Sequence, residues 1–407
     1  MAGNDNFSEK RRFIIKLGKA LHKYGTPAYR LEAHLQNVSA LLEIKASFMV
    51  TPTTLTFILS EGLDQQDYNH IARVTPGDID LGALARLDAL VDELDSQQRT
   101  LTEAIERIDE TAKQTAYGRL ITFIAFGATS GSFAMLMNTS WNSILWSTLF
   151  GFMVAIITFW SEKSSRVSNM LEPFVALITA LLASAVAIMD PSINVPLVIL
   201  SSIIVYIPGL ALTLGLSELS ARHLISGTAR VMDAVMSLFK LYFGAILGIA
   251  LAALLWGDTL FTPVENVPEW TLWIAVTLLS LSLVVLFKAR KRDIIWGVIA
   301  GYIAYGATLW GSHYLGPALG AFVGAFALGL YSNLFSRIMN LPSSIVMLLG
   351  LVMLVPGSKL YIGLNTIVSG QSIINTPDIG TQSFLIFMSL VAGLIFSDVI
   401  FPSQKTL

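Results

Sequence analysis

The chain has 407 residues, of which 54% are hydrophobic and only 13% are charged. Soluble proteins carry about 25% charged residues, so this composition excludes an ordinary soluble protein and indicates a membrane protein. The net charge of −2 favours no particular partner and we expect no nucleic acid, while the absence of cysteine excludes disulfides, thiolate metal sites and a cysteine nucleophile.

The charged residues are concentrated near the N-terminus. Residues 1–117 hold 17 of the 28 acidic residues and 13 of the 26 basic residues, and we predict that they form a cytoplasmic α+β domain. Periodicity and turn signals predict helices over 13–24 and from Thr26-Pro27 to 42, β-structure over 47–60 and 69–74, and helices over 81–94 and 97–116.

Ten apolar stretches follow this domain, each long enough for a membrane span of about 17 to 25 residues. They cover residues 120–137, 144–160, 173–189, 195–219, 232–256, 270–287, 294–310, 317–334, 341–368 and 384–401. The loops after the even-numbered spans carry Lys or Arg, whereas the alternate loops carry neither. Because basic loops stay inside the cell, both termini are predicted to be cytoplasmic.

Two proline-glycine pairs interrupt two of these spans at matching places. Pro208-Gly209 lies in the fourth span and Pro356-Gly357 in the ninth, and each pair is followed by another glycine six positions after the first. Proline removes a backbone donor and glycine removes the Cβ, so each pair loosens a helix where lipid cannot replace the lost hydrogen bonds. Ordinary kinks are one interpretation, but the repetition favours a transport site between two broken helices.

Five spans per half reverse the direction of the chain, so the two breaks would enter the membrane from opposite sides. This arrangement is the inverted-topology repeat of several secondary transporters, whose sites lie at the bilayer midplane. The predicted fold is therefore an α-helical polytopic membrane protein with an N-terminal α+β domain. Its ten transmembrane helices form two inverted five-helix repeats, residues 118–257 and 258–407.

The stretch PGLALTLGLSELSARHLISGTAR, from Pro208 to Arg230, and VPGSKLYIGLNTIVSG, from Val355 to Gly370, resemble the threonine/serine exporter family. The segment GTPAYRLEAHL at 25–35 and ARVTPGDIDLGALARLDALV at 72–91 resemble N-terminal segments of the same family. The resemblance extends over nearly the whole chain. It implies a cytoplasmic domain, ten membrane helices and proton-driven export of small amino acids, while a two-chain relative linked to succinate leaves a dicarboxylate substrate as an alternative.

The backbone at the two breaks is the first candidate for the substrate site. Exposed helix N-termini attract the carboxylate of an amino acid, and unwound carbonyls attract its ammonium group. The hydroxyl of Ser358 and the ammonium group of Lys359 complete the predicted set, although the Lys359 side chain could instead extend to the outer interface. The predicted substrate-binding residues are Pro208, Gly209, Pro356, Gly357, Ser358 and Lys359.

Acidic residues inside predicted spans are candidates for proton coupling, because a charge at the bilayer centre is costly. Glu218 lies nine residues after Gly209, where a carboxylate could exchange protons or bind the substrate ammonium group. Asp398 is the second candidate, although it lies near the cytoplasmic edge, where its side chain could instead extend to water.

These patterns together predict a secondary active exporter of threonine and serine in the inner cell membrane. Its partners are the lipid bilayer, a small amino acid and a proton as coupling ion, with no cofactor and no metal; the oligomeric state stays open, a homo-oligomer included. A membrane-tethered hydrolase using the N-terminal domain is the alternative of another class. The chain contains no H-E-x-x-H, P-loop or G-x-S-x-G motif, so we predict no enzymatic activity.

Overall fold

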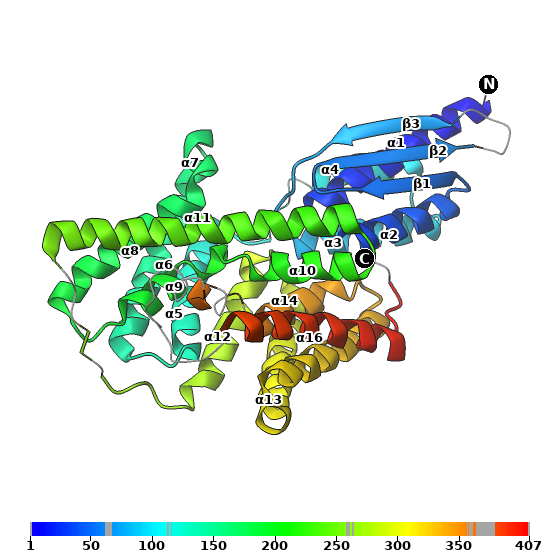
Figure 1. Ribbon diagram of the computed structural model, residues 1–407. Coiled ribbons are helices and arrows are strands. Elements are labelled where there is room, and N and C mark those ends of the chain that lie inside the picture. The colour runs from blue at the N-terminus through cyan, green and yellow to red at the C-terminus, as the bar shows by residue number, and fades with distance from the viewer. Residues whose placement is uncertain are drawn as a thin grey trace.

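The computed structural model describes the chain except for residues 1, 62–66, 112–113, 115, 258–260, 263, 356, 358–360, 364–378 and 406–407. The described part is mostly helical, with one small sheet near the N-terminus (Figure 1).

The N-terminal domain combines four helices with a three-stranded antiparallel sheet in the order β1-β2-β3. Phe57 of β2 packs over Gly18 of α1, and the remaining inward-facing strand residues join the same buried core. The elements are α1 (Ala2–Lys23), α2 (Ala28–Leu41), β1 (Lys45–Val50), β2 (Thr54–Ser60), β3 (Tyr68–Arg73), α3 (Leu81–Asp95) and α4 (Leu101–Thr111). The predicted helices and strands of this region are present, but Pro27 is the N-cap of α2 and not its first helical residue.

The remaining helices fall into two sets, which we call the first and the second membrane half. The first half contains α5 (Arg119–Leu136), α6 (Trp141–Ser161), α7 (Ser165–Asn169), α8 (Leu171–Met189), α9 (Val195–Ser202), η1 (Ile204–Tyr206), α10 (Gly209–Ser220) and α11 (Leu224–Trp256). The second half contains α12 (Thr271–Leu286), η2 (Lys291–Asp293), α13 (Ile294–Met339), α14 (Ser344–Leu354) and α16 (Ile379–Ile400).

Among the described residues, six helices are long and apolar enough to cross a membrane, and the bent pair of α9 with η1 and α10 raises the number to seven. The predicted seventh and eighth spans lie together in α13, which reverses direction at Gly316, where φ is 84° and ψ is 168°. A Cβ on Gly311 would lie 3.0 Å from the Cα of Gly320, so the two arms of α13 pack side by side. The helices α12 and α14 are shorter than a full span, and the count of ten spans stays a prediction.

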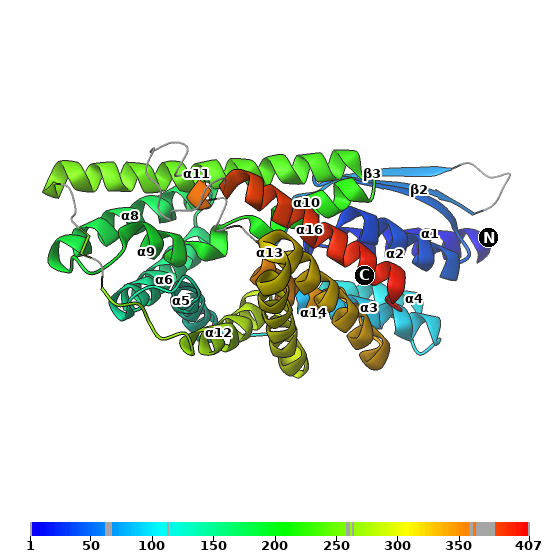
Figure 2. The same ribbon diagram turned by 60° about the horizontal axis from the view of Figure 1, so that its bottom comes forward.

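The N-terminal domain packs against one end of the helical region, close to the C-terminus (Figures 1 and 2). The backbone amides of Leu81 and Gly82, at the start of α3, donate to the carbonyls of Phe287 and Lys288 after α12. The apolar core of the domain also continues into buried residues of α12, α13 and α14. The domain is thus docked onto the membrane helices and is not a separate unit on a linker.

Candidate functional site

The first proline-glycine pair breaks its helix, as the sequence predicts. The helix α9 ends at Ser202, and after η1 the backbone becomes extended at Ile207, with φ −70° and ψ 119°. Pro208 cannot donate a hydrogen bond, and the regular α-helix resumes only at Gly209. The segments before and after the break are bent by 58°.

The helix before the second pair ends with nearly the same backbone conformation. The helix α14 ends at Leu354, and Val355 is extended, with φ −68° and ψ 126°. Gly357 is buried. The predicted binding residues Pro356, Ser358 and Lys359 lie outside the described residues, so their roles stay predictions.

The two breaks meet at their glycines. A Cβ on Gly209 would lie 3.1 Å from the Cα of Gly357, and a Cβ on Gly357 would lie 3.1 Å from the Cα of Gly209. The extended residues Ile207 and Val355 are next to the same contact, at 3.0 Å and 2.5 Å from these Cβ positions. Backbones approach this closely only where neither residue has a side chain. The close approach predicted from the sequence repeat is therefore confirmed.

The segment after each break crosses to the opposite half. The helix α10 contacts α14 and α16 of the second half, where its Leu212 packs with Phe387 and Val355. Conversely, Tyr361 and Ile362 of the second half are buried in the apolar core of the first half, beside α9; residues 361–363 form the short orange helix there in Figure 1. This reciprocal packing makes the glycine contact the point where the two halves interlock.

Two buried tyrosines, one from each half, lie at this crossing. Tyr242 of α11 and Tyr361 form an edge-to-face pair with ring centroids 5.9 Å apart, and their exposed fractions are 5% and 4%. Among the described residues, the Tyr242 hydroxyl has no hydrogen-bond partner. A buried polar group without a partner is costly in an apolar surrounding, so among the described residues this hydroxyl stands out as a candidate donor and acceptor for a polar ligand. Sequence reasoning missed both tyrosines, because no motif marks them.

The structure places Glu218 at the boundary between α10 and the N-terminal domain. Its side chain is fully buried. One carboxylate oxygen accepts from the backbone N–H of Ala28 at 2.9 Å and from Arg230 Nη2 at 3.1 Å. The other accepts from Ser226 Oγ at 2.9 Å and from Arg230 Nε at 3.2 Å. Both oxygens are thus occupied as acceptors.

Asp398 is not brought to the glycine contact. It lies near the end of α16, where its carboxylate accepts from Asn333 Nδ2 at 2.8 Å, and the same amide donates to the carbonyl of Phe401 at 2.7 Å. Phe387, which packs against α10, precedes Asp398 by eleven residues, or about 16 Å along the helix. The role of Asp398 in coupling stays a prediction that this geometry does not favour.

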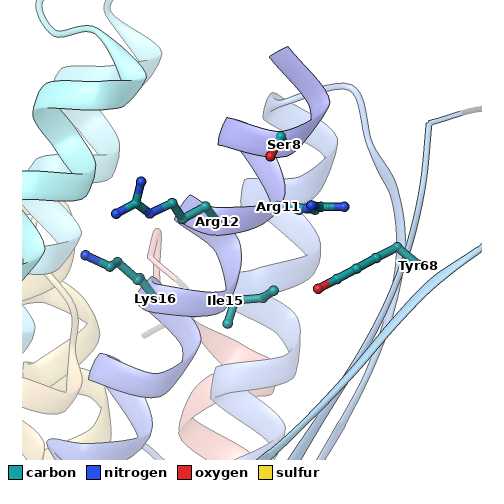
Figure 3. A pocket seen from close by; sticks show the side chains of 6 residues that line it. All are labelled: Ser8, Arg11, Arg12, Ile15, Lys16 and Tyr68. Atoms are coloured by element: carbon teal, nitrogen blue, oxygen red, sulfur yellow. The ribbon is translucent and has the colours of Figure 1, made fainter. Parts of the chain in front are cut away.

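Other parts of the described chain offer little as ligand sites. No group of three or more His, Asp or Glu residues is arranged to hold a metal ion among the described residues. A hollow of about 260 Å³ on the N-terminal domain is lined by Ser8, Arg11, Arg12, Ile15, Lys16 and Tyr68 (Figure 3). There Arg11 lies over the Tyr68 ring and Lys16 pairs with Asp109 at 2.6 Å, so two of its three cations already have partners.

The comparison with known families agrees with this arrangement. Two models of threonine/serine exporters match the chain, one over residues 12–252 and the other over residues 272–400. The chain belongs to the threonine/serine exporter family.

The curated relatives compared with this chain come from fungi, and two of the three described next are named pheromone-regulated membrane proteins. Pheromone-regulated membrane protein 10 of Eremothecium gossypii is 25% identical over 86% of the chain and 48% of its own length. The protein of that name in Saccharomyces cerevisiae is 24% identical over 93% and 51%, and an uncharacterized protein of Schizosaccharomyces pombe is 26% identical over 81% and 45%. The chain spans about half the length of these relatives. No solved structure matches it.

Proposed function

We propose that this chain is a secondary active exporter of threonine and serine, and that its substrate passes between the two broken helices. The observation that carries the proposal is the contact of Gly209 with Gly357. Two helices broken at equivalent sequence positions, with their breaks in contact, form the arrangement in which transporters build midplane sites. The family supports the substrate class.

The chemistry near the breaks suits a small zwitterion. The helix α10 begins at the first break, and the positive end of its dipole attracts a carboxylate. On the other side, the faces of the Tyr242 and Tyr361 rings attract an ammonium group, and the Tyr242 hydroxyl can accept its hydrogen bond. A small side chain such as that of threonine fits a site formed mainly by backbone.

The proposed passage would be closed when the two breaks are in contact. The Cβ positions at 3.1 Å from the opposite glycine leave no space for a substrate between the two backbones. Transport then requires the breaks to separate and close again, which is alternating access between the two halves. The similar conformations of Ile207 and Val355 and the reciprocal packing of the following segments support a two-fold relation between the halves.

Orientation and energy coupling follow from the remaining features. The basic loops support cytoplasmic termini in the inner cell membrane. Proton antiport is the coupling that the family resemblance favours. Because the chain has no cysteine, single cysteines at Ser8 and Glu269 report sidedness directly. A membrane-impermeant maleimide should label Glu269→Cys in intact cells and Ser8→Cys only after lysis, and the reverse pattern contradicts the orientation.

The decisive test is efflux from cells loaded with a threonine-containing dipeptide. Cells that produce the chain should release threonine faster than cells with an empty vector, and collapse of the proton gradient should remove the difference. The Gly209→Leu variant, inserted in the membrane at the same level, is the matched inactive control. Equal release with and without the chain contradicts amino-acid export, and faster release of succinate in its place identifies the dicarboxylate alternative.

A further inference from the structure

We propose that the N-terminal domain is a gate on transport, anchored permanently to the second membrane half and latched reversibly to the broken helix α10 through Glu218. The proposal goes beyond export itself, because it assigns a regulatory role to a domain that lies outside the substrate passage. It rests on the different character of the domain's contacts with the two halves.

The anchor on the second half consists of backbone contacts. The amides of Leu81 and Gly82 donate to the carbonyls of Phe287 and Lys288 at 2.9 and 3.1 Å. A Cβ on Gly82 would lie 2.6 Å from the Lys288 carbonyl oxygen, so these two backbone segments approach each other as closely as they can. Backbone bonds of this kind depend on no side chain and hold whenever the domain is folded.

Side chains reinforce this anchor. The buried Arg30 donates from Nη1 to Ser343 Oγ, just before α14, at 3.3 Å. Lys405, beyond the last helix, pairs with Asp88 at 3.2 Å and with Asp92 of α3. Every one of these partners belongs to the second half or to the segment that follows it.

The latch on the first half is centred on one carboxylate. The helix α2 begins after Pro27, which provides no side-chain cap, and the first amides of a helix have no partner inside it. Glu218, 190 residues away, accepts from the Ala28 amide and therefore caps α2 from the membrane half. The negative carboxylate also suits the positive end of the α2 dipole. A weaker contact, His223 Nδ1 to Glu32 Oε2 at 3.7 Å, lies beside it.

The helix α10 joins this latch to the substrate passage. Gly209, which touches Gly357, is its first residue, and Glu218 follows nine residues later, about 14 Å along the helix. A helix this short moves as a rigid rod. Because the domain is anchored to the second half, a movement of α10 as a whole away from Gly357 also draws Glu218 away from Ala28. Docking of the latch and opening of the passage therefore exclude each other.

The first experiment removes one N–H group. Ala28→Pro deletes the donor at the first position of α2, which accepts proline, and Pro27 already has the extended ψ of 148° that a following proline requires. Ala28→Val adds a side chain of similar size but keeps the donor. In the full chain in lipid nanodiscs, Ala28→Pro should speed hydrogen exchange of residues 209–220 by about tenfold, and in cells it should speed threonine efflux, whereas Ala28→Val should do neither. Unchanged exchange in Ala28→Pro, or an equal effect of both variants, overturns the latch.

The second experiment holds the latch shut. The rings of Tyr29 and His223 lie 6.4 Å apart across it, and in this cysteine-free chain a Tyr29→Cys, His223→Cys pair can be joined by a short, cleavable dithiol reagent. The matched pair Arg86→Cys, Lys288→Cys joins the domain to its anchor. The first cross-link should stop export until it is cleaved, and the second should leave export unchanged. Export at the full rate with the first cross-link, or its loss with both, overturns the gate.

These tests separate the gate from the proposed function. Hydrogen exchange of α10 reports the latch whether or not a substrate is transported. If the unmodified chain releases no threonine, threonine export is contradicted, while the exchange rates still decide whether Glu218 holds α10 to the domain. If Glu218 instead carries the coupling proton, Glu218→Gln abolishes the pH dependence of export and Ala28→Pro leaves its rate unchanged, which also overturns the gate.

Discussion

The two proline-glycine breaks have nearly the same backbone but are held in place by different means. Ile207 and Val355 differ by only a few degrees in φ and ψ. After the first break, α10 ends in a buried carboxylate that bonds to the N-terminal domain. After the second break, Tyr361 and Ile362 are held in an apolar core. The similar backbone of the two breaks is what a site with two-fold symmetry needs. Because only α10 bonds to the N-terminal domain here, the proposed control by that domain acts on the first break alone.

The largest effect should come from filling the shared contact. Gly209→Leu and Gly357→Leu should each abolish export, because even a Cβ at these positions would lie 3.1 Å from the opposite backbone. The matched control is Gly306→Leu in α13, where a Cβ would meet no atom within 4 Å. Export is measured as threonine efflux at equal membrane abundance. Full activity of either variant at the breaks would show that the glycine contact is not the passage.

The second-largest effect is expected in the N-terminal domain, where the titration of His34 should change the free energy of unfolding by about 2 kcal/mol. Burial, reinforced by the charge of Lys405, lowers the pKa of His34 to about 4 from 6.5 in the unfolded chain. The folded domain keeps His34 neutral, whereas the unfolded chain protonates this histidine below pH 6.5. The contribution of His34 to the free energy of unfolding is at its full value above pH 6.5 and decreases as the pH falls toward 4. The contribution of His34 alone should therefore make the free energy of unfolding lower at pH 5 than at pH 7 by about 2 kcal/mol.

Calorimetry of the full chain at each pH measures this effect, and His34→Gln should remove it. Burial raises the pKa of Asp88 to about 6, which stabilises the folded domain on acidification and acts in the opposite sense. The difference between the variant and the unmodified chain isolates His34. The exposed His313 serves as the control through His313→Gln. An identical pH profile for His34→Gln and the unmodified chain would contradict the assignment.

A smaller effect is expected at the tyrosine of the first half that faces the second break. Tyr242→Phe keeps the ring but removes the hydroxyl that has no partner among the described residues. The KM for threonine should rise about tenfold, the effect of one lost hydrogen bond to a charged ligand, while the melting temperature stays unchanged. The control is Tyr302→Phe, which removes a hydroxyl that bonds to Thr277. This variant should leave KM unchanged. An unaltered KM in Tyr242→Phe would remove the hydroxyl from the site.

The smallest effect is expected for a charge away from both breaks. Lys240 of α11 pairs with Glu172 of α8 at 3.2 Å, and its side chain is 44% exposed. Partly exposed ion pairs contribute less than about 1 kcal/mol, so Lys240→Met should change neither export nor stability beyond that amount. A large loss of export, measured as efflux, would show that charges outside the breaks take part in transport.

The sequence predicted the features that depend on local chemistry. A proline-glycine pair loosens a helix in an apolar span, and the repetition of the pair favours a site between the two breaks, where Gly209 and Gly357 meet. The elements of the N-terminal domain followed from periodicity and turn residues. The start of α2 was misplaced by one residue, because Thr26 does not cap it and Glu218, far away in the chain, does.

The features that could not be predicted depend on partners distant in the sequence. A lone acid in an apolar helix resembles a proton carrier, and nothing near Glu218 in the sequence reveals that the Ala28 amide will meet it. Likewise, Tyr242 and Tyr361 become a pair only because each half crosses into the other. The turn at Gly316 has non-helical φ and ψ and separates two of the predicted spans, so α13 contains two apolar stretches.

The docking of the N-terminal domain also has a consequence for biogenesis. The domain leaves the ribosome before the membrane helices, yet Arg30 and Asp92 bind Ser343 and Lys405, each 313 residues later in the sequence. At 5 to 20 residues per second, that interval is roughly 15 to 60 s of synthesis. The domain must therefore fold and wait with its docking face uncovered until the last helices are inserted. Completion of the interface thus requires insertion of α16, and a chain that lacks this helix would leave that face available to chaperones and proteases.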